Sequence, residues 1–371
     1  MLPISQTSLV PLPMKTNYRR VLAVIAAFVA GFGSLSVRGA ETPYRLLKEI
    51  PVGGDGWWDY LTVDAAGRRL YVSHGAKMVV IDLDKDEVVG EIADTPGVHG
   101  IAIAPELKRG FTSNGRENKA SIVDLETLKT LAKVETGANP DGMLYEPGQQ
   151  EVYMFNGRGQ SVTVIDAKAG TVVATIPLGG KPEFATADPQ AGRVYNNLED
   201  KNEVAVIDTK THAVLARWPI APGEEASGMA IDLQTHRLFL GAGGTNLMVM
   251  MDSTNGKVVA TVPIGAGVDA NAFDPGTQLA FASCGGAGTV TIAKEETPDK
   301  LTVVQTLKTA RGARTMTLDT QTHRIYLAAV TYEEAPAAQA PDAKQPEPTK
   351  GRPGRPKAVP GTFRILVYGM E

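Results

Sequence analysis

Short apolar segments recur along this chain, and turn-forming residues separate them. Five of these segments end in Val-Ile-Asp or a close variant, and they follow one another at intervals of roughly 42 residues. They are Val80–Asp82, Ile122–Asp124, Val164–Asp166, Val206–Asp208 and Met250–Asp252. A second kind of segment, apolar or aromatic at its start, recurs at Leu70–His74, Gly110–Asn114, Val152–Asn156, Val194–Leu198, Leu238–Ala242, Ala280–Cys284 and Ile325–Ala329. The chain therefore contains seven copies of one unit.

Each unit predicts four short strands and no helix. The segments are rich in β-branched residues, and Gly, Pro, Asn or Asp stands between them, which is typical of strands joined by tight turns. In the third unit the expected strands are Asp141–Glu146, Glu151–Asn156, Ser161–Asp166 and Thr171–Pro177. Four such strands in succession predict one antiparallel sheet per unit.

Seven sheets placed around one axis cover each other's apolar faces, which a single sheet cannot do for itself. The sequence therefore predicts an all-β fold, a single seven-bladed β-propeller over residues 41–371. The last unit supplies only the strands Thr315–Asp319, Arg324–Ala329 and Phe363–Tyr368. We expect Arg45–Val52, which has the character of the fourth strands of other units, to complete the last blade and close the ring.

Residues 333–360 interrupt the last unit with a composition that does not favour folding. The segment is rich in Pro, Ala and Lys and has few large apolar residues, so we expect a disordered insertion. Its basic run, Lys350–Lys357, is faintly similar to hooks that bind the minor groove of DNA, but a solvated linker explains the same composition. The net charge of −4 for the whole chain also gives no reason to expect nucleic acid as a partner.

The N-terminal residues follow a different pattern from the repeats. Arg19 and Arg20 precede an apolar run, Val21–Phe32, which gives way to small and polar residues. This arrangement is typical of a signal peptide, and the run is too short for a permanent membrane span. We expect residues 1–40 to be a signal peptide and N-terminal extension, cleaved near Gly39–Ala40. The mature chain is then expected to be periplasmic or secreted and to have no transmembrane segment.

The cysteine content fits an exported protein that is stabilised by packing alone. Cys284 is the single cysteine, so no internal disulfide can form. Small residues flank it, and we expect it to be a small buried hydrophobic residue. We expect the protein to be a monomer.

The repeat resembles that of a known family. Leu70–His74 and Gly110–Asn114, each followed by a strand of the Val-Ile-Asp kind, resemble the YVTN repeat. Together with the export signal, the chain from Tyr44 to Glu371 resembles the YncE-type bacterial β-propellers. The resemblance implies the fold, but similar repeats occur in surface-layer proteins, in nitrite and nitrous oxide reductases and in lactonases of the phosphogluconolactonase type. The sequence has neither a His-rich copper motif nor a Cys-x-x-Cys-His haem motif, so the reductase chemistry is not expected.

One residue of each unit is predicted to lie at the start of its innermost strand, around one mouth of the central channel. These residues are Asp59, His99, Asp141, Glu183, Ser227, Asp269 and Arg314. Carboxylates and an imidazole can hold a divalent cation, or shift one another's pKa enough for acid and base chemistry, and Arg314 can receive an anionic group. The alternative is that these polar side chains only solvate a wet channel mouth.

Two further groups of side chains are candidates for the same surface. Trp57 and Trp58 can stack on a ligand beside the mouth, or can pack between the first and last blades. His74, Asn114 and Asn156 end the second strands of the first three units and can extend the binding surface, or can satisfy turn backbone.

These features favour a binding or interaction module that receives a small ligand, a metal ion or a protein segment at the channel mouth. The only cofactor that the residues suggest is a divalent cation. The alternative is a lactonase-like hydrolase or lyase that uses His99 with Asp141 or Glu183. A binding role is the favoured interpretation, and fold analogy alone cannot decide between the two.

Overall fold

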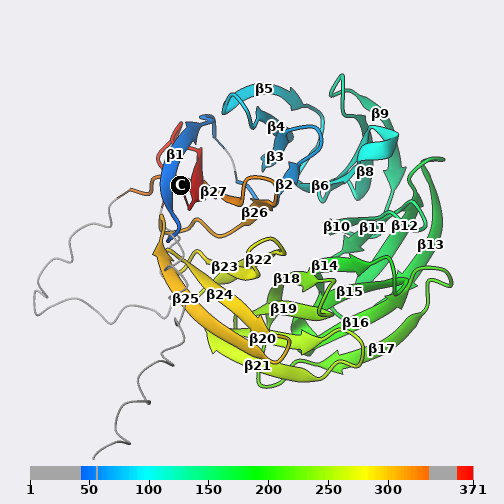
Figure 1. Cartoon of the computed structure of the whole chain (residues 1–371). Helices are drawn as coiled ribbons and strands as arrows, with labels where there is room; N and C mark the ends of the chain where they lie inside the picture. Colours follow the sequence, from blue (N-terminus) through cyan, green and yellow to red (C-terminus); the bar gives the residue numbers. More distant parts are fainter. Residues whose placement is uncertain (1–42, 56, 334–356, 371) are drawn as a thin grey trace, which may run out of the picture. The chain divides into compact units, whose positions relative to one another are not determined.

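The structure is a computed structural model that describes residues 43–55, 57–333 and 357–370. Within these residues the strands β1 to β28 form seven antiparallel sheets of four strands each. The sheets lie side by side around a central axis, as Figure 1 shows. The predicted seven-bladed β-propeller is therefore confirmed.

Each blade is one four-stranded sheet that runs from the axis outward. Blade 1 contains β2 (Leu61–Asp64), β3 (Arg69–His74), β4 (Lys77–Asp82) and β5 (Glu87–Ile92); blade 2 contains β6 (Val98–Ala104), β7 (Arg109–Asn114), β8 (Lys119–Asp124) and β9 (Thr130–Glu135). Blade 3 contains β10 (Pro140–Glu146), β11 (Glu151–Asn156), β12 (Ser161–Asp166) and β13 (Thr171–Pro177). Blade 4 contains β14 (Pro182–Asp188), β15 (Arg193–Leu198), β16 (Glu203–Asp208) and β17 (Val214–Pro219).

The second half of the ring follows the same plan. Blade 5 contains β18 (Ala226–Asp232), β19 (Arg237–Ala242), β20 (Leu247–Asp252) and β21 (Val258–Pro263); blade 6 contains β22 (Val268–Asp274), β23 (Leu279–Cys284), β24 (Thr289–Thr297) and β25 (Lys300–Lys308). Blade 7 contains β26 (Met316–Asp319), β27 (Arg324–Ala329), β28 (Arg364–Gly369) and β1 (Arg45–Pro51). Two single turns of 3₁₀ helix lie between strands, Pro105–Leu107 in blade 2 and Glu199–Lys201 in blade 4.

The two ends of the described chain meet in blade 7. Strand β1 pairs antiparallel with β28, with Arg45 opposite Gly369 and Pro51 opposite Arg364. The closing role that we predicted for the first strand is confirmed. Because the last sheet is completed from the other end of the chain, blade 7 cannot form all its strands until both ends have docked.

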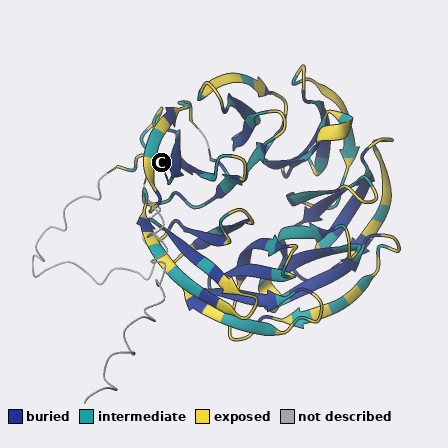
Figure 2. Ribbon diagram, in the orientation of Figure 1, coloured by how far each residue is buried: buried dark blue, intermediate teal, exposed yellow. Residues whose placement is uncertain are grey.

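The core lies between neighbouring blades. Second and third strands are buried along most of their length, whereas most residues of the outermost strands are exposed or half-buried (Figure 2). The buried apolar residues form seven clusters, and each cluster joins the facing sheets of two adjacent blades. Cys284 belongs to one of them, as predicted. One large aromatic residue on each second strand has no exposed surface: Tyr71, Phe111, Tyr153, Tyr195, Phe239, Phe281 and Tyr326.

The acids that recur at strand ends hold the turns that follow them. Asp166 accepts hydrogen bonds from the backbone N–H groups of Lys168 and Ala169, at 2.8 and 2.6 Å. At the end of an innermost strand, Asp274 accepts one from Gly276 at 2.9 Å. Such side-chain turns explain why the repeat places an acid after an apolar strand.

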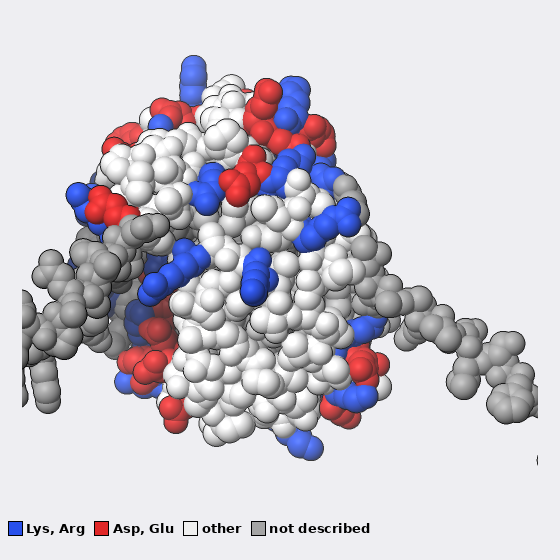
Figure 3. Space-filling model, turned by 90° about the vertical axis from the view of Figure 1, so that its left-hand side faces the viewer, with Lys and Arg blue, Asp and Glu red and all other residues white. Residues whose placement is uncertain are grey.

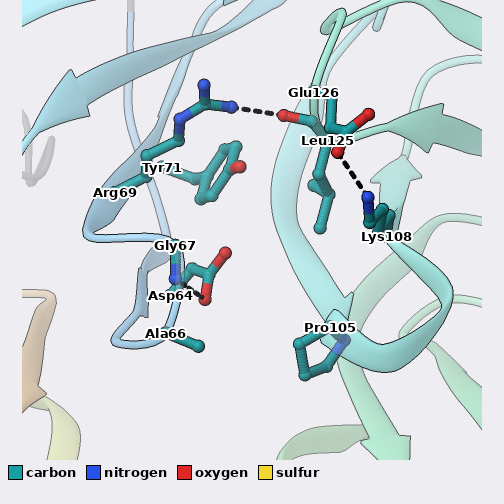
Figure 4. A pocket seen from close by; sticks show the side chains of 9 residues that line it. All are labelled: Asp64, Ala66, Gly67, Arg69, Tyr71, Pro105, Lys108, Leu125 and Glu126. Atoms are coloured by element: carbon teal, nitrogen blue, oxygen red, sulfur yellow. Dashed lines mark hydrogen bonds and ion pairs between the residues drawn. The ribbon is translucent and has the colours of Figure 1, made fainter.

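Polar contacts add to the apolar contacts between blades. Arg69 at the start of β3 donates to the carbonyl oxygen of Leu125 in blade 2, as Figure 4 shows. Arg109 at the same position of blade 2 donates to the carbonyl oxygens of Ala167 and Lys168 in blade 3, at 2.9 and 2.7 Å. In blade 3 this position is an acid, Glu151.

Between blades 3 and 4, the partner of this strand-start position also changes, from a backbone carbonyl to a side chain. The Nε2 atom of His212 in blade 4 lies 2.9 Å from a carboxylate oxygen of Glu151. The blades are therefore still joined by a polar contact, although the acid now lies on blade 3 and its partner on blade 4.

Parts of the predicted organisation lie outside the described residues. The predicted signal peptide and N-terminal extension, residues 1–40, fall there, as do residues 334–356 of the predicted insertion. At the two ends of the insertion the chain is paired, because Glu333 donates to the carbonyl oxygen of Lys357 and Tyr332 forms a β-bridge with Ala358. Among the described residues, no helix has the length and hydrophobicity that a membrane span requires.

The side of the ring that includes blade 7 carries charges of both signs. Figure 3 shows acidic and basic side chains mixed around the edge of this face, with mostly uncharged residues and single basic side chains in its middle. Strands β1 and β25 expose Leu46 and Val304 at 46% and 49%. No large patch of one sign is seen on the described part of this face, which agrees with the small net charge.

Candidate functional site at the channel mouth

The innermost strands place the predicted residues around one end of the channel. Asp59 and Arg314 precede β2 and β26, and the other members are the second residues of their strands. We call these seven side chains, Asp59, His99, Asp141, Glu183, Ser227, Asp269 and Arg314, the ring. Because each blade contributes one member at the same position, side chains distant in sequence meet at one mouth.

His99 lies between two carboxylates of neighbouring blades. Its Nδ1 atom is 2.7 Å from Oδ2 of Asp59 and 3.1 Å from Oδ1 of Asp141. All three side chains are more than four-fifths buried. Burial disfavours the charged imidazole, but the hydrogen bonds and charges of Asp141 and Asp59 outweigh it and raise the pKa of His99 to about 10. His99 therefore carries a proton at neutral pH when no cation is bound.

The acids of the ring are held away from water. Burial, and then the charge of Asp141, raise the pKa of Glu183 to about 8, although Lys181 lies 2.6 Å away and opposes the shift. Burial also raises the pKa of Asp269 to about 6 against the effect of Arg314, and it raises the pKa of Asp59. The charged form of a carboxylate in such surroundings is stabilised when a cation comes close.

The remaining members form a second group on the side of blades 5 to 7. The hydroxyl of Ser227 donates to the backbone carbonyl of Asp269 at 3.1 Å. Arg314 Nε lies 3.4 Å from Oδ2 of Asp269, and its NH2 group donates to the carbonyl of Trp58 at 3.1 Å. Arg314 is 42% exposed, so part of its guanidinium group faces the mouth and can meet a ligand.

Tyr60 closes the channel beneath the ring. This residue precedes β2 in blade 1, yet its ring centre is 4.4 Å from that of Phe184 on β14 in blade 4. Its side chain therefore crosses the channel. Tyr60 is only 9% exposed, and its hydroxyl has no hydrogen-bond partner among the described residues. Burial, and then the nearby ring acids, hold the pKa of Tyr60 far above its usual value, so it stays a neutral donor.

Gly142 lies beside the Tyr60 hydroxyl and against the backbone of blade 4. A Cβ atom at Gly142 of β10 would lie 2.9 Å from the carbonyl oxygen of Glu183 and 3.4 Å from the Tyr60 hydroxyl. In the sequence Tyr60 stood out only as part of an aromatic stretch beside the ring, and it was not among the predicted site residues. One signal was available in the sequence. The residue directly after the ring member is the aromatic Tyr60 in the first unit, whereas it is Gly142 in the third unit.

The two tryptophans have different roles. The ring of Trp57 lies edge-on to His99, with 5.1 Å between the ring centres. Trp58 is buried in the apolar cluster between blades 7 and 1, where it packs against Phe363 at 5.3 Å. Of the two alternatives that the sequence left open, Trp57 lies beside the ring, and Trp58 belongs to the core.

His74, Asn114 and Asn156 are buried and take part in contacts within or between blades. Asn114 donates to Ser121 at 2.8 Å, and Asn156 donates to Thr163 at 3.1 Å. His74 stacks on Phe363 with ring centres 4.5 Å apart. These surroundings favour the structural alternative, and the structure does not place these three side chains at the ring.

Comparisons with known proteins support the architecture. The chain in "Structure of U3-55K" has a TM-score of 0.68 and 12% identity, and the match covers 88% of this chain and 98% of that one. A chain in "Crystal Structure of Mitotic Checkpoint Complex" has a TM-score of 0.67 and 15% identity, with 84% and 96% covered. This chain is a seven-bladed β-propeller. At such identities the likeness shows the fold of the propeller alone.

Sequence comparison adds no family to this assignment. No protein-family description matches the propeller, and no curated protein matches it either. The resemblance to the YVTN repeat therefore stays a prediction. The channel geometry, and not a relative, is the basis for a functional proposal.

Proposed function

We propose that this propeller is a binding protein whose ring holds a divalent metal ion. The observation that carries the proposal is the group Asp59, His99 and Asp141, whose ligand atoms all lie within 4.8 Å of one another. Three consecutive blades contribute one residue each: His99 and Asp141 lie on innermost strands, and Asp59 lies two residues before one.

The donor types indicate which metals would fit. Imidazole suits zinc, copper, iron and nickel, whereas carboxylates are shared with manganese, calcium and magnesium. One nitrogen and two carboxylate donors favour a divalent transition metal such as Zn²⁺. Three protein ligands would leave a coordination position open toward the mouth, where Trp57 and Arg314 lie, so a second ligand can reach the ion.

Metal binding would also replace the proton that now holds the two acids together. The imidazolium of His99 satisfies Asp59 and Asp141 in the metal-free protein. A metal ion in the same position would neutralise both carboxylates while His99 donates a lone pair from Nδ1, so binding must release the imidazole proton.

The test is Zn²⁺ or Mn²⁺ titration of the purified propeller by calorimetry, with the bound metal measured by elemental analysis. Loss of a residue that only supports a metal ligand lowers metal affinity about 10- to 100-fold. Loss of a ligand itself, in His99→Ala, Asp59→Asn or Asp141→Asn, should lower the affinity by more than that. His323→Ala is the matched control, because His323 lies 2.7 Å from Asp274 in a second His–Asp pair outside the ring. Equal losses in the control, or no binding by the unchanged protein, would refute the metal site.

A lactonase-like hydrolase is the second candidate, favoured by the presence of Arg314 and Glu183 in the same mouth. Arg314 can receive a carbonyl or carboxylate oxygen, and Glu183, whose pKa burial raises to about 8, can act as a general acid or base. A panel of lactones decides this point. Turnover that is lost in Glu183→Gln and kept in His323→Ala would favour the enzyme over the binding protein.

We further propose that the propeller is exported and carries YVTN-type repeats. The basic residues Arg19 and Arg20 before the apolar run Val21–Phe32 support export. N-terminal sequencing of the mature protein should give a start near Ala40, and a chain that retains residues 1–40 in the cytoplasm would contradict the proposal.

A further inference from the structure

A cavity of about 310 Å³ lies between blades 1 and 2 (Figure 4). Asp64, the last residue of the innermost strand β2, lines it together with Pro105, Lys108, Leu125 and Glu126 of blade 2. The ring lies where the innermost strands begin, and this cavity lies where one of them ends. The two sites are therefore separate.

The Asp64 carboxylate has one oxygen without a partner. Its Oδ1 atom accepts a hydrogen bond from the backbone N–H of Gly67 at 2.9 Å. Figure 4 shows the other oxygen pointing away from Gly67, into the space between the two blades. None of the described residues donates a hydrogen bond to that oxygen. Asp64 is only 9% exposed, and a carboxylate so far withdrawn from water is stabilised by a cation that reaches it from the cavity.

Other junctions between blades show which partner an acid at this position takes. There the acid that ends the innermost strand meets a side chain that stands directly before the second strand of the next blade. Asp319 pairs with Arg68 at 2.7 Å, and Asp274 lies 2.7 Å from the Nδ1 atom of His323. The repeat therefore places a nitrogen donor opposite the acid at both of these junctions.

Lys108 stands at the corresponding position of blade 2, but it binds a different acid. Its backbone has the same left-handed conformation as that of Arg68, with φ angles of 52° and 50°. The ammonium group of Lys108 lies 2.6 Å from Glu126 at the outer rim of the cavity. Asp64 is therefore left without the cation that its counterpart Asp319 has.

The junction between blades 7 and 1 also shows which cation fits best. Its guanidinium group, from Arg68, bridges two acids, because it lies 2.7 Å from Asp319 and 3.0 Å from Asp84. Asp84 occupies in blade 1 the position that Glu126 occupies in blade 2, two residues after the third strand. A guanidinium group is planar and presents several donors in a fixed geometry, which suits a pair of acids better than an ammonium group does.

A basic residue in the wall does not exclude a second cation. Arg69 begins β3 and donates to the backbone carbonyl of Leu125, so its own charge is engaged. Arg324 begins β27 in the same way, and in that blade Asp319 still holds the guanidinium of Arg68. The fold therefore accommodates a guanidinium group beside an arginine at this position.

We propose that the cavity between blades 1 and 2 binds a guanidinium group, carried by a small guanidine or by an arginine side chain of a peptide. The group pairs with the free oxygen of Asp64, as Arg68 pairs with Asp319, and its carbon stem packs against Pro105 and Leu125. This site does not depend on the metal site proposed above.

Butylguanidine and butylurea are the probes, because they have nearly the same shape and only the first is charged. Their binding to the full propeller is measured by saturation-transfer NMR and calorimetry. Butylguanidine should bind about tenfold more tightly than butylurea. Asp64→Asn should remove that difference, because the amide keeps an acceptor for Gly67 but carries no charge.

A third probe, the Nα-acetyl amide of arginine, distinguishes the two sources of the group. Affinity equal to that of butylguanidine would assign the site to an arginine side chain of a peptide. Butylguanidine binding without binding of the arginine amide would assign it to a small guanidine.

Exchanges at Lys108 provide the second arm of the experiment. Lys108→Arg copies the junction between blades 7 and 1, so its own guanidinium should bridge Glu126 and Asp64 and abolish butylguanidine binding. Lys108→Gln is the matched control, because it supplies no cation and should leave binding intact. Asp274→Asn is the control for the acid, since Asp274 pairs with His323 away from the cavity. Thermal unfolding of every variant shows which of them are folded.

Three results would overturn the proposal. The first is equal affinity of the unchanged protein for butylguanidine and butylurea. The second is a preference for butylguanidine that survives in folded Asp64→Asn, and the third is equal butylguanidine binding by Lys108→Arg and Lys108→Gln. Zn²⁺ titration of the same samples reports on the ring separately, so failure of one site is distinguishable from failure of the other.

Discussion

The innermost strands carry acids at both ends, and the two sets behave differently. The start acids, Asp59, Asp141, Glu183 and Asp269, belong to the ring. The end acids, which include Asp188, Asp232, Asp274 and Asp319, are at most 4% exposed. Both sets are largely withdrawn from water, so burial alone does not distinguish a site from a structural residue.

The donors that surround each acid make the difference. End acids accept hydrogen bonds from the backbone of the next turn, as Asp188 does from Gln190 and Ala191. Burial would raise the pKa of Asp319, but the Arg68 guanidinium, Thr322 and the backbone outweigh it and lower the pKa. Start acids meet His99, Lys181, Ser227 and Arg314, which are side chains that a ligand can displace. Burial of acids with displaceable partners is what marks the candidate site.

Removing an end acid should have the largest effect on stability. Asp319 has a fully buried side chain, and it pairs with Arg68 of blade 1 at 2.7 Å while accepting the N–H of Gln321. Asp319→Ala should lower the free energy of unfolding by about 3 kcal/mol, because it removes a charge-assisted hydrogen bond from Arg68 and the acceptor of two hydrogen bonds from the following turn. Chemical denaturation measures the loss.

The start acid Asp269 provides the contrast in that measurement. Asp269→Asn should not lower stability comparably, since its ion-pair partner Arg314 is 42% exposed and can turn to water, and the amide keeps the shape of the side chain. Similar losses in Asp319→Ala and Asp269→Asn would remove the distinction between the two sets.

A buried acid without a full set of donors should make stability depend on pH. Glu295 on β24 accepts from Thr235 at 2.7 Å, and burial followed by the charge of Asp232 raises its pKa to about 7, with Arg237 opposing. The folded state then binds this proton more tightly than the unfolded state. Stability should therefore fall as pH rises from about 4.5 to 7, by up to about 3 kcal/mol.

Glu295→Gln should remove this dependence, because the amide does not titrate. Denaturation midpoints of the variant and of the unchanged protein should agree near pH 4.5 and separate progressively up to pH 7, with the variant the more stable. A constant difference across this range would show that Glu295 does not titrate there.

The smallest effect is expected for the half-exposed acids that end third strands. Asp166→Ala removes the side-chain acceptor for Lys168 and Ala169, whose backbone groups can turn to water instead. We expect a loss of about 1 kcal/mol in the free energy of unfolding. A loss as large as that of Asp319→Ala would show that accessibility to water does not set the scale of these effects.

Much of the propeller followed from local sequence patterns. Alternation of apolar residues and turn residues predicted the strands of blade 3 within one residue. The shortage of strands in the last unit placed Arg45–Val52 in blade 7, where the structure has the strand Arg45–Pro51. The seven ring members could be selected because each repeat brings the same position to the same end of the channel. What the repeat could not supply is the surroundings of each side chain.

The sequence by itself determined the number of blades, the closing strand and which position of each unit faces the mouth. Only the tertiary structure decided that Tyr60 crosses from blade 1 to Phe184 in blade 4, and that Trp58 is core while Trp57 lies beside His99. The physical reason is distance along the chain. Strands and turns depend on neighbours within a few residues, whereas these contacts join blades whose relative positions are fixed only when the circle of blades closes.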